Sequence, residues 1–321
     1  VKINRYNFRD STSHKIDGTI AFATGAFSLN YQGLFSSFSD YFDLELTASV
    51  SMPRNVDNFY GLGNDTKKVK DDKSYYRVRY EYAILNPRLK HQVNDQFSFN
   101  FGLFYRYFNV NDTAGRFIGD TGLNMLDSSA YDRHHFVGMN AGIEFDTRDN
   151  KVLPTRGLLW DVAASGFYGL DEDAKNYVKL RSDLRFYLSF TADPRVVFAF
   201  RFGGAMNLGS YEFYQANFLG GRTNLRGFRS NRFAGDHAFY QNTEIRFKLM
   251  NLRSYLFNGQ TGFYLFNDLG RVWVDGEQST RWHDGYGIGV WLTPFEFTAL
   301  TFSYNLSYDD KLFAFSFKFL F

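Results

Sequence analysis

The 321-residue chain has no cysteine, only five prolines and no uninterrupted apolar run of 18 residues. The absence of cysteine excludes disulfides, thiolate metal sites and a cysteine nucleophile. Without a long apolar run, a membrane-spanning helix is excluded. No low-complexity linker divides the sequence, so we expect one domain over residues 1–321. No cleavable signal sequence is visible at its start, which indicates a mature or trimmed chain.

Charge and motifs exclude further classes of protein. The net charge is only +2, so charge does not suggest nucleic acid as a partner. The stretch "GGRTNLRG", residues 220–227, lacks the Gly-Lys-Ser/Thr ending of a phosphate loop, and no Gly-x-Ser-x-Gly nucleophile motif occurs. His134 and His135 are adjacent, but neighbours in a strand point to opposite faces and do not readily share a metal. We expect no enzyme, no metal and no cofactor.

Aromatic residues are what the sequence has in excess: they form 20% of the chain and follow an alternating pattern. In "FAFSFKFLF", residues 313–321, every odd position is Phe, and in "YVKLRSDLRFYLSF", residues 177–190, apolar and charged residues alternate. Because successive side chains of a strand point to opposite faces, each segment has one apolar and one polar face. Such segments reach ten residues or more, the length of a strand that crosses a bilayer rather than that of a globular strand.

The connections between these segments are of two kinds. Turns near Asp40, Asp193 and Pro294 are tight, whereas those near 52–74, 108–134 and 208–236 are long. Outer-membrane barrels show this asymmetry, with short periplasmic turns, long external loops, apolar residues toward lipid and polar residues toward the lumen. The pattern predicts an all-β, transmembrane antiparallel barrel, with a large soluble β protein as the alternative.

The alternation marks about fifteen strands. Bacterial barrels usually have an even number, so we expect about sixteen, with one strand lying before Val1 or missed in this count. The expected positions are near 1–9, 14–24, 27–37, 41–51, 75–86, 95–108, 135–146, 157–169, 175–191, 195–207, 238–250, 261–274, 284–293, 295–307 and 311–321.

The long connection 208–236 carries the basic stretch "FLGGRTNLRGFRSNRFAGD". In the following strands, parity places Glu244 with Arg246 and Lys248 on the polar face, and Asp268 opposite to Phe263 and Leu265. An arginine of the loop is therefore expected to enter the lumen and pair with Glu244 and Asp268. Away from water, such a charge-assisted pair is firmer than a surface ion pair.

Four stretches resemble the BamA/TamA superfamily of outer-membrane assembly and translocation barrels, also called bacterial surface antigens. They are "GG" with "LRGF" (225–228), "IEFDTRDNKVLPTRG" (143–157), "YLFNDLGRVW" (264–273) and "GYGIGVWLTPF" (285–295) with the Phe-ended strand after it. The resemblance implies that Arg226, Gly227 and Phe228 belong to an inserted loop whose arginine meets Glu244 and Asp268. It also implies that assembly machinery reads the terminal aromatics, Phe319 and Phe321.

The resemblance further implies an integral protein of the outer membrane of a Gram-negative bacterium, in contact with lipid, polypeptide substrates or periplasmic accessory proteins. It suggests insertion or export of polypeptides through a lateral seam between first and last strands. The N-terminal stretches "SHKIDGTIAFATGAFSLNYQGLF" and "FYGLGNDT" look like barrels that follow a metallophosphoesterase domain. A passive anchor or conduit for a periplasmic phosphoesterase is therefore the alternative function, and a diffusion porin a third.

Overall fold

The computed structural model describes residues 2–7, 10–22, 24–36, 38–111, 113, 115–120, 126, 128–253, 258–294 and 298–321, with side chains from residue 12 on except that of Ser128. Strands and short 3-10 turns are the regular elements of these residues. No helix in the described part of the chain has the length and apolar character needed to cross a membrane.

Fifteen long strands form the wall of the molecule. They are β1 (Lys2–Asn7), β2 (Asp10–Ala21), β3 (Ala26–Phe35), β4 (Asp43–Asn58), β5 (Arg77–Gln92), β6 (Phe97–Asn111), β7 (Arg133–Asp146), β8 (Gly157–Gly169), β9 (Tyr177–Leu188), β10 (Val196–Gly209), β13 (His237–Arg253), β14 (Asn258–Trp273), β15 (His283–Pro294), β16 (Leu300–Leu306) and β17 (Lys311–Ser316). The shorter elements are β11 (Asn217–Leu219), β12 (Phe233–Gly235), η1 (Lys73–Tyr76), η2 (Phe117–Gly119), η3 (Ser128–Tyr131) and η4 (Phe213–Gln215).

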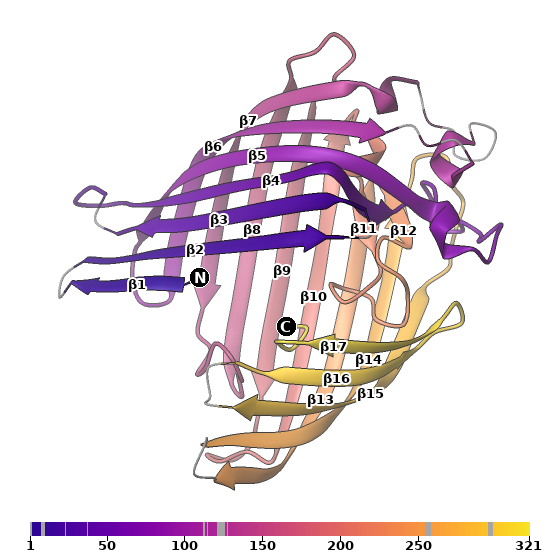
Figure 1. Cartoon of the computed structure of the whole chain (residues 1–321). Coiled ribbons are helices and arrows are strands. Elements are labelled where there is room, and N and C mark those ends of the chain that lie inside the picture. Colours follow the sequence, from indigo (N-terminus) through magenta and orange to yellow (C-terminus); the bar gives the residue numbers. More distant parts are fainter. Residues whose placement is uncertain are drawn as a thin grey trace.

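Each wall strand pairs antiparallel with its neighbours along the chain, so the fifteen form a single meander. The sheet curls around a central space, with β1 and β17 as its two edges (Figure 1). Strands β11 and β12 form a separate two-stranded sheet between β10 and β13 in the sequence. The prediction of an all-β antiparallel barrel fold is confirmed.

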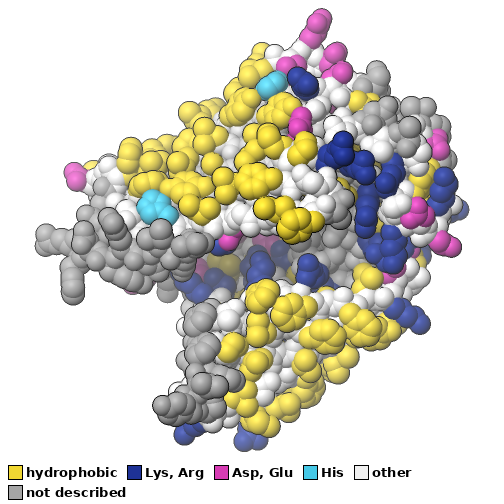
Figure 2. All heavy atoms as spheres, viewed as in Figure 1, with side chains coloured by type: hydrophobic (Ala, Val, Ile, Leu, Met, Phe, Trp, Pro, Cys, Tyr) yellow, Lys and Arg dark blue, Asp and Glu magenta, His cyan; other side chains and the backbone are white. Residues whose placement is uncertain are grey.

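The apolar faces of the strands point outward, as the alternation predicts. Ile20, Leu103, Met139, Tyr168 and Phe313, which all lie in strands, are more than half exposed. Hydrophobic side chains spread over the outside of the wall, whereas lysines and arginines line the hollow between the two edges (Figure 2). A soluble protein would bury such rings in its core, because exposing large apolar patches to water is unfavourable. The outer face therefore suits a lipid environment.

The three long connections lie at one end of the barrel, together with the short β2–β3, β8–β9 and β16–β17 turns, whereas the β5–β6, β7–β8 and β9–β10 turns lie at the other end. At the long-loop end, residues from the β4–β5, β6–β7 and β10–β13 connections pack into an aromatic cluster that includes Phe59, Tyr76, Phe117, Ile118 and Phe213. The β4–β5 connection is shorter than expected, because β4 continues past Pro53 to Asn58 with a register shift between Ser51 and Asn55. A bulge accommodates the proline without ending the strand.

The end of the sheet differs from the sequence prediction. Alternation predicts a strand to Phe321, but β17 stops at Ser316 and pairs with β16 only between Lys311 and Ser316. Residues 317–321, here called the terminal segment, leave the sheet. Phe317 remains 68% exposed, whereas Phe319 and Phe321 are buried. Only part of the predicted wall of phenyl rings therefore faces outward.

Candidate functional site

The β10–β13 connection, residues 210–236, folds back into the barrel. Its β11–β12 hairpin brings Leu219, Leu225, Phe228 and Phe233 together in a fully buried cluster against Ala238 and Val272 of the wall. Apolar burial of this kind contributes roughly 1.5–3 kcal/mol per large side chain. This inserted loop is thus a packed part of the lumen.

Arg226 lies at the centre of the inserted loop and is 5% exposed. Its Nε and Nη2 donate to the two carboxylate oxygens of Asp268, at 2.8 and 2.7 Å, and its Nη1 donates to Glu244 at 2.5 Å. Its main-chain N–H also donates to Asp268, at 2.9 Å, and its guanidinium lies 3.6 Å from the ring centre of Phe266. Burial alone lowers the pKa of Arg226, but Asp268 and Glu244 outweigh burial and raise it. The arginine therefore remains charged.

The expected partners of the loop arginine are thus present at both predicted positions. Glu244 and Asp268 are fully buried, on the inner face of β13 and β14. A buried carboxylate without a cation would be strongly destabilising, so the three groups depend on one another.

Gly227 and Phe228 fix the backbone and the packing next to Arg226. Gly227 has φ = +89°, which favours glycine, and a Cβ there would lie 2.5 Å from the main-chain oxygen of Leu306. Phe228 is fully buried, with its ring edge-on to those of Phe233 and Tyr308, at 5.4 and 5.2 Å. The wall opposite also needs a glycine, because a Cβ on Gly285 would lie 1.8 Å from the Arg226 carbonyl oxygen.

The other three arginines of the loop hold the edge hairpin β16–β17. Arg229 pairs with Asp310 at 3.2 Å and Arg232 with Asp309 at 2.7 Å, both in the turn of that hairpin. Arg222 donates to the main-chain oxygen of Phe315 in β17. Sequence reasoning missed these partners, because two aspartates in a short turn look like ordinary turn residues.

A second anchor of the loop also escaped the sequence analysis. Arg201 of β10 donates through Nη1 to the Thr223 oxygen at 2.7 Å and through Nε and Nη2 to Asp183 of β9, at 2.8 and 2.5 Å. Tyr240 completes the group by donating to Asp183 at 2.7 Å. Lumen parity places Arg201 and Asp183 inside, but only the register of β9, β10 and β13 puts them side by side.

Glu244 connects the inserted loop to the terminal segment. Its second oxygen accepts from Nε of Arg246 at 2.8 Å, and Nη2 of Arg246 donates to the main-chain oxygen of Phe321, also at 2.8 Å. The Arg246 guanidinium lies 4.1 Å from the ring centre of Phe319. The ring of Phe319 packs on Tyr264 and Trp291, and that of Phe321 on Tyr187. Phe319 and Phe321, predicted to face outward, are therefore lumen residues here, because Arg246 and these rings give them a buried place.

No group of three or more His, Asp or Glu side chains within the described residues is arranged to hold a metal ion. His134 and His135 point to opposite faces: His134 is buried beside Tyr214 Oη, at 3.0 Å from its Nδ1, and His135 contacts Tyr105 Oη on the outside, at 2.7 Å.

Comparison with solved structures supports the architecture. BamA from Haemophilus ducreyi lacking POTRA domains 1–3 superposes with a TM-score of 0.70 at 15% identity, over 95% of this chain and 63% of that one. CdiB from Acinetobacter baumannii superposes with a TM-score of 0.56 at 16% identity, over 95% of this chain and 53% of that one. CdiB from Escherichia coli superposes with a TM-score of 0.53 at 14% identity, over 96% of this chain and 57% of that one. This chain therefore spans less than two thirds of the length of each of these structures, and the likeness concerns the fold.

A family model, the Omp85 superfamily domain, matches residues 18–319. That match covers the end of β2, all later strands, the inserted loop and both of its acidic partners, so the chain belongs to the Omp85 superfamily.

Proposed function

We propose that this chain is an integral barrel of a Gram-negative outer membrane that helps to insert or export polypeptides. Its outward apolar face, the superfamily match and the motif resemblance support this proposal. In this proposal the seam lies between β1 and β17, the two edges of the sheet. An incoming strand adds to an exposed edge by main-chain hydrogen bonds.

One observation carries the mechanism: the inserted loop holds the β16–β17 hairpin from inside. Arg222, Arg229 and Arg232 of the loop contact this hairpin, and Arg226 fastens the same loop to β13 and β14. Strand β17 pairs with β16 over only six residues, so its own ladder holds it weakly. The loop therefore acts as a brace that keeps the edge in position while the seam accepts a strand.

The test uses the absence of cysteine. Because β1 and β17 are not paired with each other, a cysteine pair on the two edges, Asn4→Cys with Ala314→Cys, is joined by a bismaleimide whose linker contains a reducible disulfide. The matched control, Ser303→Cys with Ala314→Cys, is treated in the same way and links two strands that are already in register. In proteoliposomes, insertion of an added barrel substrate should stop on crosslinking of the seam pair, return on reduction of the linker, and continue in the control. Undiminished insertion by the crosslinked seam pair would overturn the seam mechanism.

The alternative, an anchor or conduit for a periplasmic phosphoesterase, is supported by the N-terminal stretches that resemble such barrels, residues 13–35 and 59–66. It requires no seam opening, so proteoliposomes would insert no substrate even when both cysteine pairs are reduced. A diffusion porin is disfavoured, because the packed inserted loop occupies the lumen. Small, irregular single-channel conductance would agree with that occupancy, whereas a large steady conductance would favour the porin.

A further inference from the structure

A cavity of about 850 Å³ lies inside the barrel, between the inner faces of β9 and β10 and the terminal segment. The β7–β8 turn, the inserted loop and the end of β17 complete its wall, and apolar side chains such as Phe319 and Leu320 share the lining. No carboxylate of the described residues lines this space, here called the basic cavity. Six cations do: Arg148, Lys151, Arg185, Arg201, Arg222 and Lys318.

Two carboxylates outside this lining neutralise part of the charge. Asp146 accepts from Nε and Nη2 of Arg148, both at 2.9 Å. Asp183 is shared by Arg185 and Arg201, at 2.6 and 2.5 Å. Six cations with two carboxylates leave four positive charges without an acidic partner among the described residues. Like charges beside apolar walls repel one another more strongly than in open water.

Four of the cations have N–H groups that a ligand in the basic cavity can reach. Lys151, Arg222 and Lys318 are exposed and form no ion pair with any described residue. The side chain of Arg185 is 25% exposed and holds Asp183 through its Nε, which leaves its two Nη groups for a ligand. A bound anion can therefore contact these four side chains without displacing the existing ion pairs.

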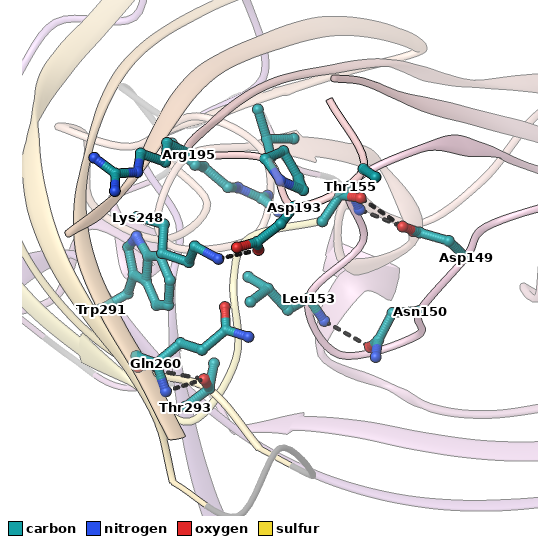
Figure 3. Close-up of a pocket in the computed structure, with 14 residues that line it drawn as sticks. Asp149, Asn150, Leu153, Thr155, Asp193, Arg195, Lys248, Gln260, Trp291 and Thr293 are labelled. Atoms are coloured by element: carbon teal, nitrogen blue, oxygen red, sulfur yellow. Dashed lines mark hydrogen bonds and ion pairs between the residues drawn. The ribbon is translucent and has the colours of Figure 1, made fainter. Parts of the chain in front are cut away.

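The β7–β8 turn, which carries two of the six cations, is held by its own hydrogen bonds. Asp149 of this turn accepts from the N–H and the hydroxyl of Thr155, at 2.9 and 2.5 Å (Figure 3). Asp149 lines a separate cavity of about 310 Å³, where Asp193 pairs with Lys248. These two acids are therefore engaged elsewhere and do not neutralise the basic cavity.

The lining favours an anion with several charges over a cation or a neutral molecule. A cleft lined by one sign of charge, with walls of low dielectric constant, concentrates ions of the opposite sign. The volume of the basic cavity lies in the range of sites for organic ligands rather than single small ions. A lipid would have to bring its acyl chains into this polar lumen, which is unfavourable, whereas an acidic polypeptide has no such chains.

We propose that the basic cavity binds an acidic segment of a polypeptide, whose carboxylates contact Lys151, Arg185, Arg222 and Lys318. Anion binding rests on the cavity alone, whereas the polypeptide source rests on the proposed function. The bound segment then lies beside the terminal segment and the inserted loop, next to the edge strand β17.

The test measures binding to the full chain in micelles of an uncharged detergent, by isothermal titration calorimetry. Three hexapeptides with blocked ends are compared, in which Gly alternates with Glu, with Gln or with Lys. Pyrophosphate and the short-chain lipid dihexanoyl phosphatidylglycerol are titrated separately. The Gly–Glu peptide should bind saturably and more weakly as salt is added, whereas the Gly–Gln and Gly–Lys peptides should not bind.

A pair of substitutions locates the binding. Lys151→Gln with Lys318→Gln should weaken the affinity for the Gly–Glu peptide by roughly two- to thirtyfold, because each exposed ion pair contributes little. The matched control, Lys67→Gln with Lys311→Gln, removes two exposed cations that do not line the basic cavity and should leave the affinity unchanged. Both variants change the net charge equally, so the comparison separates local binding from attraction to the whole protein.

No saturable binding of any acidic ligand, equal binding of the Gly–Gln peptide, or equal weakening by the control pair would each overturn anion binding in this cavity. Binding of pyrophosphate or of the lipid without binding of the Gly–Glu peptide would overturn the polypeptide source. The seam crosslinking experiment uses none of these ligands, so the proposed function and the basic cavity can fail separately.

Discussion

Arg226 and Asp268 form a bidentate ion pair in which both carboxylate oxygens receive a guanidinium N–H, at 2.8 and 2.7 Å. The two residues are 42 positions apart in the sequence. Replacing Arg226 by Ala leaves Asp268 and Glu244 buried with one cation fewer. We expect a loss of roughly 3–5 kcal/mol in the free energy of unfolding, measured by urea titration in detergent. Arg226→Lys keeps the positive charge but loses the bidentate geometry, so its free energy of unfolding should lie between those of the unchanged protein and Arg226→Ala. Unchanged unfolding of Arg226→Ala would contradict this role.

Glu244→Gln tests whether one carboxylate joins the inserted loop to the terminal segment. The neutral amide retains the shape but weakens the contacts to both Arg226 and Arg246. We expect faster amide hydrogen exchange in residues 317–321 as well as in residues 222–228. Asp17→Asn, which removes the exposed ion pair with Lys15, serves as the control and should leave both segments protected. Faster exchange in the loop alone would show that Glu244 does not couple the two.

Arg232 and Asp309 join the inserted loop to the edge hairpin, and a double-mutant cycle measures this pair. The two side chains are 3% and 11% exposed, so solvent screens their interaction only in part. Arg232→Gln and Asp309→Asn, alone and together, should show a coupling energy of about 0.5–3 kcal/mol in unfolding. Strictly additive effects would mean that the contact is energetically neutral.

Gly285→Ala should displace the inserted loop. Its new methyl group would lie 1.8 Å from the Arg226 carbonyl oxygen, a main-chain atom that cannot rotate away. We expect destabilisation by more than the 1–3 kcal/mol usual for overpacking, together with greater protease sensitivity of residues 220–232. Gly166→Ala is the matched control, because a Cβ there meets nothing within 4 Å and stability should hardly change. Equal stability of the two variants would mean that the loop does not rest on Gly285.

Much of the wall follows from alternation alone. Each of the fifteen expected segments overlaps one observed strand, and parity places Glu244, Arg246 and Asp268 on the inner face. Parity succeeds because a strand has a fixed period of two, so that one outward residue settles the direction of its neighbours. The arginine that enters the lumen was identified by the motif resemblance, since spacing cannot choose among the four arginines of the loop.

What alternation could not predict depends on contacts distant in sequence. Phe319 and Phe321 continue the pattern of Phe313, yet they leave the sheet because Arg246 and the rings of Tyr264 and Trp291 receive them inside. Likewise, Asp309 and Asp310 become partners of Arg232 and Arg229 only because the inserted loop folds into the barrel. That loop precedes the two aspartates by more than 70 positions in the sequence. The period of the sequence pattern depends on the local backbone conformation, so it carries no information on contacts between residues distant in sequence.

Glu244 has two oxygens and accepts from a different arginine with each, so we expect a displacement at one end of this chain of contacts to weaken the contacts at the other. A strand that drew Phe321 out to extend the edge would take away one hydrogen-bond acceptor of Arg246. Arg246 would then be free to turn more fully toward Glu244, in competition with Arg226. Under the proposed function, pairing of an incoming strand with β17 would in this way weaken the contacts by which the inserted loop holds that edge.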